Sequence, residues 1–355
     1  MPLLALLEFL RSCALALAGA VTLLSLLLLV ERSIAALTSR RVKRREAVLA
    51  PLVYQAIQEP EGQAATDWAL GGFDRHVVRG ILLRLAIDLR GDSGDAIAAL
   101  YQRLGLFQVD AARLRSWSVT RRARAAVDLG LIRVRGALPF LLGAIEDRDT
   151  RVRQAAAWAI GQVADRDALI GLIRLLGDPS AVVARRAQEV LAERGREIED
   201  ALVTYAGESG SREGRLRAIE LLGWLRVSDA VELLLRLMAD PDAEIRVKAV
   251  KAAAAIGDPR FLAPFHDALE DAQWEVRCQA ARGLSVLGSP LSVTRLSRAL
   301  RDPQWWVRFY AAVALAEVGA VGEAALTEAV EGDSPPARDM ARYLLERGSA
   351  VPALP

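Results

Sequence analysis

Aspartate and arginine recur along this sequence in pairs six residues apart. A carboxylate can act as a general acid or base, and a guanidinium can hold an anion, so one such pair in a cleft would suit acid–base chemistry on an anionic substrate. The pairs are, however, repeated along the chain: Asp147/Arg153, Asp240/Arg246, Asp271/Arg277 and Asp302/Arg308. A repeated lattice of this kind favours a structural role over a catalytic one.

Other chemistry has little material in this chain. The only cysteines are Cys13 and Cys278, and the only histidines are His76 and His266. These numbers exclude a disulfide framework or a cysteine-rich zinc site. The sequence also lacks GxGxxG, P-loop, HExxH, CxxC and GxSxG motifs. We therefore expect no catalytic site, no metal and no cofactor.

Composition favours a helical protein with a substantial core. The chain has 355 residues, of which 53% are hydrophobic and 25% charged, and its net charge is +2. Alanine and leucine carry the apolar excess, and both favour helix over strand. Because the net charge is small, we do not expect nucleic-acid binding through a strongly basic surface.

The elements that position the Asp and Arg residues repeat with a period of 31 residues. Stepping by that interval gives an arginine at every position but one: Arg122, Arg153, Ala184, Arg215, Arg246, Arg277 and Arg308. Three residues after each position stands an alanine: Ala125, Ala156, Ala187, Ala218, Ala249, Ala280 and Ala311. Seven residues after each position the residue is apolar: Leu129, Ile160, Leu191, Leu222, Ala253, Leu284 and Leu315.

Each repeat is predicted to be a helix, a tight turn and a second helix. Proline often follows the repeat aspartate and ends the first helix, as at Pro179, Pro241 and Pro303. The alanines let neighbouring helices approach closely, and a single hairpin cannot bury its apolar face, so the hairpins must stack into an α-solenoid. The glycine-rich unit 184–214 predicts an irregularity with a bend, and the two prolines at 335–336 predict a terminal cap.

The repeats resemble the HEAT family, and more narrowly the short HEAT-like repeats of phycobilisome lyases. The matching strings are DRDTRVRQAAAWAIG, DPDAEIRVKAVKAAAAIG, DAQWEVRCQAARGLSVLG and DPQWWVRFYAAVALAEVG. The resemblance implies an all-α, right-handed α-solenoid of about seven to eight hairpins. It also implies that the Asp and Arg residues form a hydrogen-bonded ladder within and between repeats, in a protein that serves as an interaction scaffold.

The N-terminal segment predicts a membrane anchor. Ser12–Val30 is nineteen residues without a charge, nearly enough to cross a bilayer as a helix. A cleaved signal peptide and a buried core helix are the alternatives. More cations follow the span than precede it, which places the N-terminus outside and the rest in the cytoplasm, at a bacterial inner membrane. The basic cluster after the span serves this topology or contacts anionic lipid headgroups: Arg40, Arg41, Lys43, Arg44 and Arg45.

The predicted organisation has five parts. Residues 1–38 are the anchor helix, and residues 39–67 are a polybasic juxtamembrane linker, irregular from Pro51 to Thr66. Residues 68–115 are the helical start of the solenoid, with helices at 74–89 and 95–104, the second capped by Asp92 or Ser93. Residues 116–348 are the repeats and 349–355 a tail.

Aromatic residues gather at the turns of the last repeats. Trp274 and Trp305 occupy equivalent positions, and three more aromatics follow the second: Trp306, Phe309 and Tyr310. Packing against the next turn and the terminal cap is one interpretation. The other is a contact patch for a protein partner, because tryptophan and tyrosine dominate interface hot spots. Trp158 and Trp224 lie within second helices and are expected in the core.

The predicted solvent face of the second helices carries two rows of side chains. The first row leans basic and consists of Arg186, Arg217, Lys248, Gln279 and Tyr310. The second row is mixed and consists of Glu189, Glu220, Lys251, Arg282 and Val313. A solvated face is the simplest interpretation, and a groove for an acidic partner segment is the other.

The predicted function is that of a non-catalytic, single-pass membrane scaffold. Its solenoid would dock an integral membrane protein or complex at the cytoplasmic face. Membrane-anchored proteins of this family are associated with bacterial exopolysaccharide systems, so the resemblance implies a processive glycosyltransferase as partner. The alternatives are a lyase-like helper that binds a cofactor or chromophore in the solenoid groove, and nucleic-acid binding by the basic row.

Overall fold

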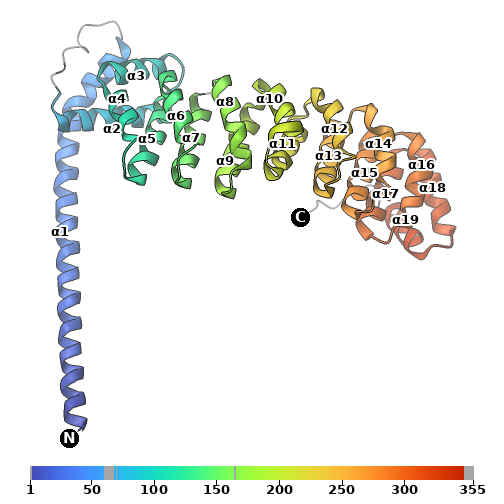
Figure 1. The fold of residues 1–355 in the computed structure, drawn as a ribbon, viewed down its shortest axis with the longest axis horizontal. Coiled ribbons are helices and arrows are strands. Elements are labelled where there is room, and N and C mark those ends of the chain that lie inside the picture. The colour runs from blue at the N-terminus through green and yellow to red at the C-terminus, as the bar shows by residue number, and fades with distance from the viewer. Residues whose placement is uncertain (1, 60–67, 69, 164, 348–355) are drawn as a thin grey trace. The chain divides into compact units, whose positions relative to one another are not determined.

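The computed structural model describes residues 2–59, 68, 70–163 and 165–347 of the chain. Within these ranges, the side chains at 2–16, 18, 27, 28, 30, 31, 33–35, 208 and 209 are not described. Helices follow one another throughout the described residues, and no strand occurs among them (Figure 1). The predicted all-α class is confirmed.

The chain divides into two compact units, residues 1–112 with 131–133 and residues 113–130 with 134–355. The first unit consists of α1 (Pro2–Gln58), α2 (Gly72–Asp88), α3 (Asp92–Arg103) and most of α4 (Leu106–Arg113). Both predicted helices of this region are present. The predicted cap of the second is wrong, because α3 begins at Asp92 and its N-cap is Gly91, whose φ of 61° favours glycine.

The predicted irregular segment from Pro51 to Thr66 is wrong as far as Gln58, because α1 continues through this proline to that residue. Positions 60–66 of the predicted segment lie outside the described residues. An internal proline removes one backbone hydrogen bond and costs a helix about 3 kcal/mol. The turns around it, however, pack on α2 and α3 and bury Leu49, Val53 and Ala56. This tertiary packing offsets the local penalty.

The N-terminal part of α1 carries an exposed apolar surface. Six large apolar side chains between residues 17 and 29 are each more than half exposed: Leu17, Val21, Leu23, Leu24, Leu26 and Leu29. A search of the described residues finds no helix whose apolar stretch is long enough for a membrane crossing. Part of the predicted span Ser12–Val30 falls on side chains outside the description, namely those at 12–16, 18, 27, 28 and 30. The structure thus gives the predicted transmembrane helix no support.

In the second unit, second helices begin every 31 residues. They are α5 (Val119–Ile132), α7 (Thr150–Val163), α9 (Ala181–Arg194), α11 (Arg212–Leu225), α13 (Ala243–Ile256), α15 (Trp274–Leu287) and α17 (Trp305–Glu317). The first helices are α6 (Leu138–Ala144), α8 (Arg166–Ile173), α10 (Glu199–Thr204), α12 (Val231–Leu237), α14 (Leu262–Ala268) and α16 (Val293–Ala299). Short helical turns accompany them: η2 (Arg135–Ala137), η3 (Arg174–Gly177), η4 (Gly195–Glu197), η5 (Tyr205–Ser209), η6 (Ser228–Ala230), η7 (Pro259–Phe261) and η8 (Pro290–Ser292). The predicted terminal cap is the pair α18 (Ala320–Glu331) and α19 (Pro335–Arg347).

Small residues set the spacing of the second helices. All seven repeat alanines are buried, as are the seven apolar residues four positions after them. The approach is closest at two glycines, where an added Cβ would lie 2.6 Å from Cα of Ala159 at Gly130 and 2.8 Å from Cα of Ala252 at Gly223. These distances leave no room for a side chain, so the small residues are required for stacking.

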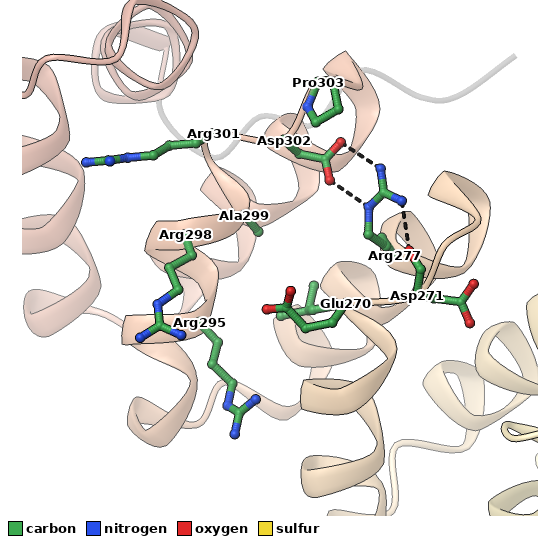
Figure 2. Close-up of a pocket in the computed structure, with 10 residues that line it drawn as sticks. Glu270, Asp271, Arg277, Arg295, Arg298, Ala299, Arg301, Asp302 and Pro303 are labelled. Atoms are coloured by element: carbon green, nitrogen blue, oxygen red, sulfur yellow. Dashed lines mark hydrogen bonds and ion pairs between the residues drawn. The ribbon is translucent and has the colours of Figure 1, made fainter.

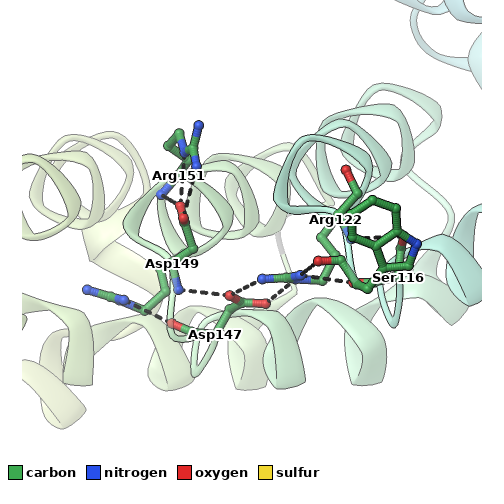
Figure 3. A network of polar contacts seen from close by, with 8 residues as sticks. Ser116, Arg122, Asp147, Asp149 and Arg151 are labelled. Atoms are coloured by element: carbon green, nitrogen blue, oxygen red, sulfur yellow. Dashed lines mark hydrogen bonds and ion pairs between the residues drawn. The ribbon is translucent and has the colours of Figure 1, made fainter.

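The predicted ladder of Asp and Arg residues is present. We call each link from the repeat arginine to the aspartate of the next repeat a rung. In four rungs the arginine forms two hydrogen bonds to that aspartate, as from Arg277 to Asp302 at 2.7 and 3.0 Å (Figure 2). Arg215 reaches Asp240 only as an ion pair at 3.5 Å. Arg122 reaches Asp147 in the same way at 2.7 and 2.9 Å (Figure 3). Two other rungs are Arg153 to Asp178 and Arg246 to Asp271.

Each rung also closes the turn of its own repeat. Nη1 of Arg277 donates to the backbone oxygen of Asp271, six residues earlier, at 2.8 Å. The carboxylate of Asp271 in turn accepts from the backbone N–H of Gln273 at 2.8 Å. One arginine therefore joins two successive turns, and one aspartate both ends a first helix and receives the previous rung.

The ladder is interrupted in the irregular repeat. Ala184 and Ser209 replace the arginine and the aspartate, so no rung joins these turns. Here α11 packs on η3 of the preceding repeat, and Arg217 donates to the backbone oxygen of Leu176 at 2.6 Å. At the end of the ladder, Arg308 keeps the bond to its own turn, but its buried Nε has no partner in the described part of the chain.

We predict that Asp271→Asn lowers the free energy of unfolding by about 1–3 kcal/mol, because the substitution replaces a half-buried bidentate acceptor for Arg246 with a neutral amide. Chemical denaturation followed by circular dichroism measures this change. Asp200→Asn is the matched control, because the Arg166–Asp200 pair has the same 2.8 Å distance at an exposed position. Equal effects of the two substitutions would show that the ladder contributes no special stability.

Candidate functional site

The ladder carboxylates accept hydrogen bonds from the rung arginines and from backbone N–H groups, and these bonds support the fold. The hydrogen bonds from Arg122 hold the pKa of Asp147 below its ordinary value. Burial alone would raise the pKa of Asp271, but the bonds from Arg246 and the backbone reverse this and leave it lowered. A general acid needs a proton near neutral pH, whereas these groups remain ionised.

Neither Cys278 nor His266 is placed as a catalytic group. The thiol of Cys278 is buried, and burial raises its pKa to about 11, so little thiolate exists at neutral pH. The ring of His266 is half-buried and its Nε2 contacts the hydroxyl of Ser292 at 2.9 Å. No group of three or more potential metal ligands occurs among the described residues.

The predicted basic row lies on the second helices but is largely paired within the protein. Lys248 and Lys251 share Glu220, at 3.1 and 3.8 Å. Arg186 pairs with Glu189 at 2.9 Å, and Arg217 bonds the backbone as described above. Arg282 donates to Gln279 at 3.3 Å and lies over the ring of Tyr310, 5.2 Å from its centroid. The row is therefore less available to an acidic partner than its composition predicts.

The aromatic residues of the last repeat form one continuous cluster. Trp305 stacks on Phe309 with centroids 5.1 Å apart, and Trp306 meets Trp305 edge-on at 4.7 Å. Phe309 also contacts Tyr343 of the cap, at 6.4 Å. Phe309 and Tyr310 are buried, whereas Trp305 and Trp306 are 42% and 37% exposed. Trp274, at the equivalent position one repeat earlier, is half-buried.

The burial of Phe309 and Tyr310 agrees with the packing interpretation, and the exposure of Trp305 and Trp306 agrees with a contact patch. Phe309 and Tyr310 pack against the cap and Arg282, so Tyr310 is not on the solvent face as predicted, and neither is Val313. Trp305 and Trp306 rest on these buried rings and present their outer surfaces. We call these two side chains the tryptophan patch.

Two other tryptophans were misplaced or missed by sequence reasoning. Trp224 was expected in the core but is 58% exposed. Polar residues stand at three of its repeat-equivalent positions, Gln162, Glu193 and Glu317, and could have identified a solvent-facing site, although Ala255 and Val286 stand at two others. Trp117 is 84% exposed at the turn before α5. It occupies the position where later repeats carry the turn proline, and this equivalence was the available signal.

The basic cluster on α1 lines a groove of about 950 Å³ with the start of α2. Arg45 forms two hydrogen bonds to Asp74, both at 2.7 Å, and these bonds lower the pKa of that carboxyl. Arg41 lies over the ring of Phe73, 4.8 Å from its centroid. Lys43 is exposed on the same helix but does not line the groove.

A second basic surface, not anticipated from the sequence, lies on α16 and the turn after it. Arg295, Arg298 and Arg301 line a cavity of about 290 Å³ that also contains the Arg277–Asp302 rung (Figure 2). The equivalent positions on the preceding first helix are Pro264, Asp267 and Glu270. The change from Asp267 and Glu270 to Arg298 and Arg301 between adjacent repeats could have indicated this basic surface from the sequence.

Paired helices, a repeating rung and a buried row of small residues define the second unit as an α-solenoid of helical hairpins. The family model for HEAT repeats matches residues 110–192, 199–273 and 262–346. The chain belongs to the HEAT repeat family, and it is a HEAT-repeat helical scaffold.

The solved structures similar to this chain include one with a TM-score above 0.5, which supports the same fold. Kap121p bound to Nup53p matches with a TM-score of 0.52 and 15% identity, over 84% of this chain and 41% of that one. The complex of CpcE and CpcF of phycocyanin lyase from Nostoc sp. matches with a TM-score of 0.32 and 20% identity, over 68% of this chain and 94% of that one. A search of curated protein sequences found no match.

We predict that Phe309→Ala lowers the free energy of unfolding by about 3–5 kcal/mol, because it removes a buried ring that joins the last repeat to the cap. Trp305→Ala should cost less than about half as much, because its outer surface is already exposed. Chemical denaturation measures both. Equal losses would mean that the tryptophan patch is a packing element rather than a free surface.

Proposed function

We propose that the protein is a non-catalytic scaffold whose HEAT-repeat unit docks a membrane protein through the tryptophan patch. The observation that carries this proposal is the pair of partly exposed rings held rigidly on buried aromatics. Rigid aromatic side chains lose little conformational entropy on binding and supply large contact area, and for this reason they dominate interface energetics. The basic row flanks the second helices and would contribute polar contacts at the edge of the interface.

We further propose that α1 tethers the scaffold to the bacterial inner membrane, with its N-terminus outside and the repeats in the cytoplasm. The support is the exposed apolar surface between residues 17 and 29, followed by the basic cluster from Arg40 to Arg45. Apolar surface of this extent on an exposed helix is unfavourable in water unless something covers it. The excess of cations after this surface sets the orientation. A tether raises the concentration of the repeats near membrane partners.

The first test is co-purification of the full-length protein from native membranes in mild detergent, with mass spectrometry of what accompanies it. We expect one membrane protein in stoichiometric amount. A processive glycosyltransferase is the partner class that the family resemblance implies. Recovery of the protein without a partner but with a bound small molecule or nucleic acid would instead favour a lyase-like helper or a nucleic-acid binder.

Substitution of both patch tryptophans, Trp305→Ala with Trp306→Ala, should reduce recovery of the partner at least tenfold while helical content stays normal. Trp117→Ala with Trp224→Ala is the matched control, because it removes two exposed tryptophans elsewhere. Partner recovery is measured by quantitative mass spectrometry. Undiminished recovery with the patch variant would remove the patch from the interface.

The orientation is tested by fusing a reporter to the C-terminus. Alkaline phosphatase is active only outside the cytoplasm. Green fluorescent protein fluoresces when it stays in the cytoplasm but not when the usual export pathway carries it across the membrane. We expect fluorescence in the membrane fraction and no phosphatase activity. The opposite pair of results would reverse the topology, and fluorescence in the soluble fraction alone would contradict the tether.

A further inference from the structure

The groove on α1 has a pattern that none of the assignments above uses. Along one face of α1 it presents Leu37, then the arginines at 40, 41, 44 and 45, then Val48. Leu37 and Val48 are both more than half exposed. The other wall is the start of α2, where Gly71 and Gly72 leave the space above them open. The groove is therefore basic in its middle and apolar at both ends.

Two of the four arginines are available to a ligand. Arg45 is engaged by Asp74 and Arg41 by the ring of Phe73. Arg40 and Arg44 are exposed, and no ion pair to either occurs among the described residues. They are one helical turn apart, so both guanidiniums can reach the same bound segment. The two engaged arginines hold the groove walls together and leave the other two for an anion.

The dimensions match a short piece of extended polypeptide. Leu37 and Val48 are eleven residues apart on a helix, a distance of about 16 Å. An extended chain rises about 3.3 Å per residue, so roughly five residues span this distance. Carboxylates in the middle of such a segment would meet Arg40 and Arg44, and apolar residues at its ends would cover Leu37 and Val48.

We propose that this groove binds an extended acidic segment of a partner protein, with carboxylates between two apolar residues. A phospholipid fits the groove poorly, because its charge lies at one end and its apolar chains at the other, whereas the groove is apolar at both ends. The inference rests on the proposed scaffold role, and it adds a second docking point that is separate in sequence from the tryptophan patch.

The test is peptide binding to the full-length protein in mild detergent, by fluorescence anisotropy. The probe is a labelled peptide with the core Leu-Asp-Glu-Asp-Leu between glycine–serine flanks. We expect saturable binding that weakens with added salt, because exposed charge pairs are screened. The amide peptide Leu-Asn-Gln-Asn-Leu has the same shape without charge and should bind at least tenfold more weakly.

Two variants assign the site. Arg40→Gln with Arg44→Gln should weaken peptide binding about tenfold or more, and Gly72→Leu should weaken it by occupying the open space without changing charge. Arg295→Gln with Arg298→Gln is the matched control, because it removes two exposed arginines from α16. It should leave binding unchanged. Circular dichroism and the unfolding midpoint verify that every variant folds.

Several outcomes would overturn the proposal. These are absence of peptide binding, equal binding of the amide peptide, and equal binding by the Arg40/Arg44 variant. Binding to phosphatidylglycerol vesicles that depends on Arg40 and Arg44, without peptide binding, would assign the groove to the membrane surface instead. The peptide assay needs no native partner, so the two proposals can fail separately. If the partner co-purifies but no peptide binds, the proposal for the groove is wrong. If the peptide binds but no partner co-purifies, the proposal for the tryptophan patch is wrong.

Discussion

The bidentate bond from one repeat's arginine to the next repeat's aspartate is the interaction on which the solenoid depends. Each rung satisfies several polar groups at once, since the arginine also bonds its own turn and the aspartate also accepts a backbone N–H. These groups are half-buried, where an unpaired charge would be costly. All the hydrogen bonds of a rung can form only when successive turns lie at one particular distance, so the rung fixes that distance. That distance in turn brings the second helices so close that only alanine or glycine fits between them.

Where the ladder stops, the chain satisfies its polar groups differently. Where Ala184 of one repeat and Ser209 of the next stand in place of the two rung residues, Arg217 bonds a backbone oxygen of η3, and α11 packs on that turn. At the other end, Asp333 stands 25 residues after Arg308, as in the other rungs, but its side chain is exposed. No bond between the two occurs among the described residues, and the buried Nε of Arg308 has no partner there. The ring contact between Phe309 and Tyr343 of α19 links the last full repeat to the cap where this rung is absent.

The period of 31 residues made the repeats predictable, because every repeat buries the same alanine and the same apolar position. The predictions that failed depended on neighbours that periodicity does not encode. The helix passes through Pro51 because α2 and α3 pack on the turns around it, and local propensity contains no information on that packing. Tyr310 is buried against Arg282 of the preceding repeat and the neighbouring rings of Trp306 and Phe309. Trp224 shows the opposite error: its residue type predicted burial, although glutamate or glutamine stands at this repeat position in three other repeats.

The ladder also determines which charges remain for recognition. The chain is nearly neutral overall, and many of its carboxylates and cations pair with one another within and between repeats. Composition consequently hides the surfaces that can bind a partner, because an arginine in a rung and an arginine in a groove look alike in sequence. Arg40 and Arg44 differ from the rung arginines in that they are exposed and that no aspartate of the described chain reaches them. Recognition by this scaffold should therefore depend on the few groups that its own architecture leaves unpaired, and on the two tryptophans that its buried rings hold at the surface.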